Sequence, residues 1–162
     1  MKKLMIFLGS LLFLSCAEPS KDQTPAIMTV EVDTIGSYPI QNIIDGNPLS
    51  FFKSSKISNS NSIEITIHFS KPMQISKVIV SNLITEVYAF GSMTFLHSID
   101  SPDGNGGSWE ILGNVTPSSN NFDVTELSYD FNTVKTSWFK LILKNNNNIV
   151  NDTFYITEVS FK

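Results

Sequence analysis

The clearest pattern in the chain is a strict alternation of apolar and polar residues from Ile63 to Phe69. Isoleucines and the phenylalanine occupy every second position, and Glu64, Thr66 and His68 lie between them. Because successive side chains of a β-strand point to opposite faces, the alternation predicts a strand with one buried face and one polar face.

Seven further segments are rich in β-branched or aromatic residues and are separated by Gly, Pro, Asn and Ser. Their bounds are 27–32, 75–80, 93–99, 109–115, 127–131, 138–143 and 154–161. No segment shows a helical stripe of apolar residues. The pattern therefore predicts an all-β fold, an antiparallel β-sandwich of about eight strands, and leaves its topology open.

The N-terminal segment is expected to be an export signal rather than part of this fold. Lys2 and Lys3 precede an apolar stretch, residues 4–14, that is too short to span a bilayer as a helix. Residues 1–15 end before Cys16, the single cysteine, in a context that resembles the lipobox of bacterial lipoproteins. The alternative is an ordinary signal peptide followed by an incidental cysteine.

The lipobox resemblance implies a place in the cell. The thiol of Cys16 would carry lipid. The next residue is Ala17 rather than aspartate, which resembles bacterial lipoproteins destined for the outer membrane or cell surface. Residues 16–25 are polar with two prolines and predict a flexible tether. Residues 26–162 remain as one domain, so membrane contact is expected through the lipid anchor only.

Composition excludes several classes of function. The formal net charge is -4, arginine is absent and the lysines are scattered, so no basic stripe exists for nucleic acid. No nucleophile stands beside a base, and two histidines with one lipidated cysteine make catalytic zinc and thiol chemistry improbable. The chain is therefore predicted not to be an enzyme.

Four segments together resemble a known family. They are the run Asp-Gly-Asn-Pro-Leu-Ser-Phe-Phe at 45–52, the strand 63–69 followed by Lys71-Pro72, Ser-Pro-Asp-Gly at 101–104 leading to Trp109, and the strand 138–141 together with the closing strand 158–161. In this order they resemble the discoidin family, also called coagulation factor 5/8 type C, whose bacterial members include galactose-binding-like carbohydrate-binding modules. The resemblance covers about residues 27–162 and implies a jelly-roll β-sandwich.

The resemblance also implies a structural calcium ion. Its oxygen ligands would be Asp45, Asn47, Ser50 and Glu158, with backbone carbonyls completing the shell. The alternative is that Asp45 caps a turn and Glu158 is solvated. In the same run Gly46 is expected to take a backbone conformation closed to other residues, and the two phenylalanines at 51 and 52 to enter the core.

Ligand binding in this family takes place on loops at one end of the sandwich. The aromatic and polar residues predicted there are Tyr88, Phe90, His97, Asn145 and Asn146. The alternatives are that the rings cover the end of the core and that His97 is a core-edge histidine. The absence of arginine removes the bidentate donor of a usual galactose site.

Two functions follow from these observations. The first is a non-catalytic, lipid-anchored module that recognises a glycan or glycoconjugate at the bacterial envelope through its end loops. The second is an adhesion or protein-interaction subunit that uses the same loops to bind a host or partner protein.

Overall fold

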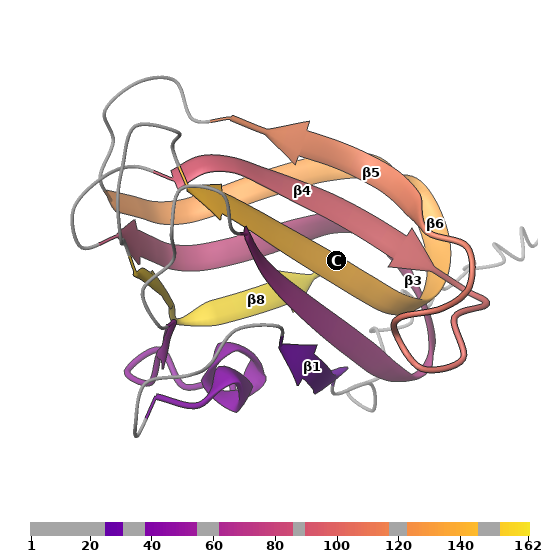
Figure 1. The fold of residues 1–162 in the computed structure, drawn as a ribbon, viewed down its shortest axis with the longest axis horizontal. Coiled ribbons are helices and arrows are strands. Elements are labelled where there is room, and N and C mark those ends of the chain that lie inside the picture. The colour runs from indigo at the N-terminus through magenta and orange to yellow at the C-terminus, as the bar shows by residue number, and fades with distance from the viewer. Residues whose placement is uncertain (1–24, 31–37, 55–61, 86–89, 117–122, 146–152) are drawn as a thin grey trace, which may run out of the picture.

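The computed structural model describes residues 25–30, 38–54, 62–85, 90–116, 123–145 and 153–162, and these form strands and one short helix (Figure 1). The elements are β1 (Pro25–Val30), the 3-10 helix η1 (Ile40–Ile44), β2 (Phe52–Lys53), β3 (Ser62–Thr85), β4 (Phe90–Ser98), β5 (Glu110–Val115), β6 (Asp123–Asn145), β7 (Phe154–Ile156) and β8 (Glu158–Phe161). The all-β prediction is confirmed. No helix in these ranges has the length and apolarity that crossing a bilayer would need.

The strands form two antiparallel layers that share β3 and β6 (Figure 1). In the first layer the early part of β3 pairs with β1 and with the late part of β6, and β4 and β5 follow beyond β6. In the second layer the late part of β3 pairs with the early part of β6, with β7 and with β8, and β2 pairs with β7. The predicted sandwich is therefore confirmed.

The two long strands differ from the expected pattern of short ones. The sequence indicated separate strands at 63–69 and 75–80, whereas β3 runs through both and passes from one layer to the other. Its register with β6 shifts between His68 and Met73 and again between Ile75 and Lys77. Such irregularities bend a strand, so Ser70, Lys71 and Pro72 mark a bend instead of a chain reversal.

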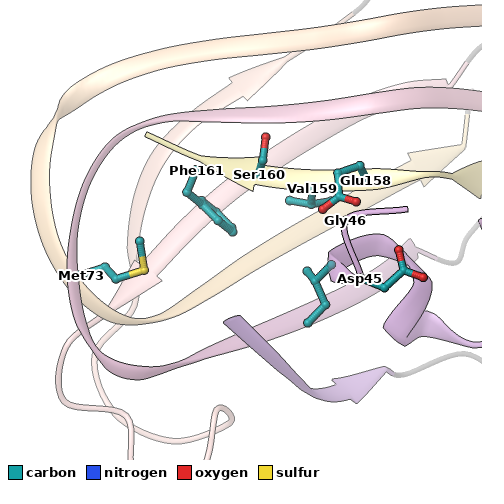
Figure 2. A pocket seen from close by; sticks show the side chains of 8 residues that line it. Asp45, Gly46, Met73, Glu158, Val159, Ser160 and Phe161 are labelled. Atoms are coloured by element: carbon teal, nitrogen blue, oxygen red, sulfur yellow. The ribbon is translucent and has the colours of Figure 1, made fainter. Parts of the chain in front are cut away.

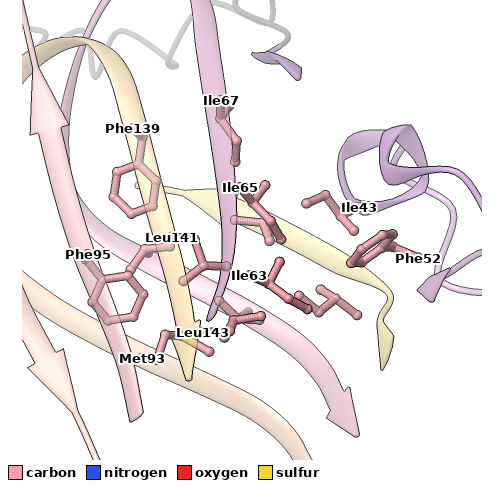
Figure 3. Close-up of a cluster of buried hydrophobic side chains, with 14 of the residues drawn as sticks. Ile43, Phe52, Ile63, Ile65, Ile67, Met93, Phe95, Phe139, Leu141 and Leu143 are labelled. Carbon is pink, nitrogen blue, oxygen red and sulfur yellow. The ribbon is translucent and has the colours of Figure 1, made fainter. Parts of the chain in front are cut away.

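The core lies between the layers and follows the alternation of the strands (Figure 3). Ile63, Ile65 and Ile67 of β3 are fully buried, and so are the inward-facing residues of the paired β6 and β4. Those residues are Phe139, Leu141, Leu143, Met93 and Phe95. Burying each such side chain stabilises the fold by about 1.5–3 kcal/mol, which explains why the alternating sequence selects this register.

The turn after β4 covers part of the outer face of the first layer. Trp138 and Thr66 point away from the core yet are only 4% and 1% exposed. A Cβ placed on Gly104 would lie 2.7 Å from the Trp138 ring, so the turn packs directly onto that side chain. Beside it, the Lys140 ammonium pairs with Glu64 and lies 4.5 Å from the centroid of the Trp109 ring.

The acidic residues of this turn hold its backbone in place. The Asp100 carboxylate accepts hydrogen bonds from the Ser108 N–H at 2.8 Å and the Ser98 hydroxyl at 2.9 Å, and these bonds lower its pKa. The Asp103 carboxylate accepts the N–H groups of Gly106 and Asn105, both at 2.9 Å, which lowers its pKa too. Both carboxylates therefore hold backbone N–H groups.

Candidate functional site

The segment 45–50 is a loop that its own side chains hold in place. Asp45 follows η1, and its carboxylate accepts the N–H of Asn47 at 2.8 Å and the hydroxyl of Ser50 at 2.7 Å. The amide oxygen of Asn47 accepts the N–H of Leu49 at 3.1 Å. Gly46 has a φ of +71°, the conformation expected there because only glycine enters it without strain. The loop thus fixes the position of the Asp45 carboxylate.

Glu158, the first residue of β8, meets this loop from a distant part of the sequence. Burial raises the pKa of its carboxyl, the nearby charge of Asp45 raises it further, and the hydrogen bond from the Gly46 N–H offsets part of the rise. One carboxylate oxygen, Oε2, is buried without a hydrogen-bond partner. The structure therefore brings together the two carboxylates that the resemblance predicted.

These residues fit a calcium ion in their donor chemistry. Calcium prefers six to eight oxygen ligands, and carboxylate, amide and hydroxyl oxygens are concentrated in the 45–50 loop and at Glu158. The unpartnered Oε2 beside the second carboxylate is also a position that a cation would favour. Within the described ranges, no three His, Cys, Asp or Glu side chains cluster as a metal site. Calcium binding stays a prediction.

A hollow of about 330 Å³ opens beside these carboxylates (Figure 2). It is lined by Ile44, Asp45, Gly46, Met73, Glu158, Val159, Ser160 and Phe161. Asp45 and Glu158 lie at one end, Met73 lies at the other, and the Phe161 ring lies between them. Sequence analysis missed Met73 and Phe161 because only the bend of β3 and the closure of β8 bring them to the loop.

The predicted ligand residues are distributed unevenly. Phe90 and Asn145 face each other in the register of β4 and β6, at the end of the sandwich where Thr85 also meets Phe154. His97 lies near the opposite end of β4, is 8% exposed, and its Nε2 is 3.5 Å from the Glu110 carboxylate. The structure therefore does not bring His97 together with Phe90 and Asn145. Tyr88, Asn146 and the proposed lipidation residue Cys16 lie outside the described residues.

Beside the β2–β7 pair lies a row of partly exposed aromatic rings. Sequence analysis did not predict this row. Phe52 is buried as expected. The prediction that Phe51 also enters the core is wrong: its ring stays partly exposed, because neighbouring residues at the start of a strand point to opposite faces. The Phe51 ring stacks on Tyr38 at 4.5 Å between centroids and approaches Tyr155 at 5.9 Å. The Lys53 ammonium lies 4.7 Å from the centroid of the Tyr155 ring.

Comparison with solved structures identifies the fold, although no protein-family model and no curated protein matches the sequence. A chitosan-binding module from Paenibacillus sp. IK-5 superposes with a TM-score of 0.64 and 13% identity, over 86% of this chain and 95% of that module. CBM32-3, from a family 31 glycoside hydrolase of Clostridium perfringens, superposes with a TM-score of 0.65 and 14% identity, over 85% and 90%.

The same fold also occurs as one part of a larger protein that is an enzyme. A GH29 fucosidase from Ruminococcus gnavus, solved with fucose, superposes with a TM-score of 0.63 and 14% identity over 85% of this chain. This chain spans only 25% of the fucosidase, so the likeness concerns one part of that enzyme. The predicted galactose-binding-like jelly roll is thus confirmed, and the chain has the β-sandwich fold of solved carbohydrate-binding modules.

Proposed function

We propose that the chain is a non-catalytic binding module that recognises a glycan or glycoconjugate through loops at one end of its sandwich. The observation that supports this is the superposition over 95% of a chitosan-binding module and 97% of a CBM32-2 module solved with GalNAc. Such a superposition includes the strands that present the loops.

The ligand residues are proposed from the strand ends. Phe90 and Asn145 are neighbours in the register of β4 and β6. In the sequence, Tyr88 lies two residues before Phe90, and Asn146 directly follows Asn145. An aromatic ring packs on the apolar face of a sugar, and amides satisfy its hydroxyl groups. We therefore place glycan recognition at this end.

A glycan array followed by calorimetry on the positive sugars tests the proposal. Asn145→Ala is expected to weaken binding by about tenfold, the cost of one or two buried hydrogen bonds. Asn132→Ala is the matched control, because Asn132 is an exposed residue of the same strand at its bend. Absence of any glycan binding at millimolar sugar by folded protein would refute the proposal, and so would equal binding by both variants.

A second candidate function is an adhesion or protein-interaction subunit. The observation that favours it is the complete absence of arginine, the residue best suited to hold neighbouring sugar hydroxyls. A negative glycan array combined with capture of a surface protein, lost in Asn145→Ala and kept in Asn132→Ala, would establish this function. Sugar binding with the same variant dependence would dismiss it.

The location is proposed from the N-terminal segment. Cys16 would carry lipid and anchor the module at the bacterial envelope, in the outer membrane or at the cell surface. Labelled palmitate should enter the native protein and not the Cys16→Ser variant. A free thiol at Cys16 in protein isolated from cells would overturn the proposed location.

Calcium is proposed at Asp45, Asn47, Ser50 and Glu158, where it would tie the loop to the closing strand. A ligand that binds only the folded state raises the melting temperature, so calcium should stabilise the native protein relative to chelator. The Asp45→Asn variant should lose this response. Asp103→Asn should keep it, because Asp103 lies in the turn after β4 and holds backbone N–H groups. An unchanged midpoint in the native protein would disprove the site.

A further inference from the structure

The hollow beside Asp45 is larger than an ion requires. Its volume of about 330 Å³ lies at the lower end of the range for small-molecule pockets, about 300–1,000 Å³. A calcium ion would contact only the end that carries the carboxylates, and the part beside Met73 and Phe161 would remain available (Figure 2). The shape therefore suits a molecule with a body attached to its charged group.

The acidic end of the hollow has unmet bonding capacity. The ion pairs Lys77–Asp130, His97–Glu110 and Lys140–Glu64 all lie away from the two carboxylates of the hollow. The buried Oε2 of Glu158 also has no hydrogen-bond partner. A buried acceptor without a partner is costly, so this end favours a group that brings positive charge and N–H donors.

The other end of the hollow is apolar and held in place. The Phe161 ring packs edge-on against Phe69 at 5.0 Å and against Phe139 at 4.9 Å between centroids. Phe69 and Phe139 are core residues that are at most 1% exposed, so they fix the Phe161 ring. Met73 adds an adaptable thioether on the facing strand. This end favours the C–H surface of a compact ligand.

We propose that the hollow binds a small organic ammonium ion in competition with calcium. The ammonium group lies between Asp45 and Glu158 and donates to their oxygens, and the body of the ligand contacts Met73 and Phe161. The site is separate from the glycan-binding end, where Phe90 meets Asn145, and it does not depend on the function proposed there. Its ligand is either a free alkylamine or an amino sugar, since both carry the same charged group.

Calorimetry with matched pairs of probes tests the site. In the presence of chelator, n-butylammonium is compared with n-butanol and glucosamine with glucose, because in each pair a hydroxyl group replaces the ammonium group. At least one amine is expected to bind about tenfold more tightly than its neutral match, and excess calcium is expected to weaken that binding. The amine that binds identifies the source of the ligand.

Three variants connect the binding to the hollow. Glu158→Gln should weaken amine binding about tenfold. Glu126→Gln should not change it, because Glu126 is an exposed acid of β6 that does not line the hollow. Met73→Ala should weaken amine binding and leave the response to calcium intact. Equal affinity for amine and neutral probes, amine binding that Glu158→Gln leaves unchanged, or calcium binding without any amine binding would each overturn the proposal. If Asn145→Ala loses glycan binding but keeps amine binding, the amine site is supported as separate from the glycan site.

Discussion

Substitution of Gly104 by alanine tests how the turn after β4 packs on the sheet. Gly104 has a φ of +85°, and its new Cβ would lie 2.7 Å from a Trp138 ring carbon and 3.0 Å from the Thr66 methyl. Both neighbours are nearly fully buried and have little room to move. The left-handed backbone costs a residue with a Cβ about 1–2 kcal/mol, and overpacking adds about 1–3 kcal/mol. The expected loss of unfolding free energy is thus about 2–5 kcal/mol.

Two other glycines separate these contributions. Gly46 also has a positive φ, +71°, but an added Cβ would meet nothing within 4 Å, so Gly46→Ala should cost only the backbone term, about 1–2 kcal/mol. A Cβ on Gly106 would meet its nearest neighbours at 3.7 Å, an ordinary contact distance, at a position without a positive φ. Gly106→Ala should therefore lie within about 0.5 kcal/mol of the native protein.

Urea unfolding followed by tryptophan fluorescence measures these differences. The midpoint should fall in the order Gly106→Ala, Gly46→Ala, Gly104→Ala, with a constant slope, because the area exposed on unfolding is unchanged. Equal midpoints for Gly104→Ala and Gly46→Ala would refute the reasoning, since they would show that the turn moves away from Trp138 without cost.

The remaining predictions concern charge and burial. Because burial raises the pKa of Glu158 in the folded chain, its ionisation opposes folding. In chelator, Glu158→Gln should raise the melting temperature at neutral pH, and the gain should vanish below the ordinary carboxyl pKa; a constant gain would contradict this. Lys140→Met should lower the unfolding free energy measured in urea by about 3 kcal/mol, because it leaves the Glu64 carboxylate without its partner. Adding Glu64→Leu to this variant should restore stability. Phe52→Ala should cost about 3–5 kcal/mol, clearly more than Phe51→Ala measured alongside.

The alternation of residues along the chain was sufficient to predict the fold class. Ile63, Ile65 and Ile67 point to the core because a strand has a period of two, and a slip of one residue would expose all three. The same pattern did not show that 63–69 and 75–80 belong to one strand. Ser70-Lys71-Pro72 is equally compatible with a turn and a bend, and only the pairing of β3 with β6 across both layers decides between them.

The candidate site also has one part that the sequence determines and one part that only the tertiary structure determines. The sequence by itself determined the 45–50 loop, because Asp45, Asn47 and Ser50 form their hydrogen bonds within a few residues of one another. The tertiary structure decided what this loop faces. Pairing between distant strands brings Glu158, Met73 and Phe161 to the loop. Local sequence patterns do not predict such long-range pairings. Long-range packing therefore turned a recognisable loop into a pocket with an acidic and an apolar end.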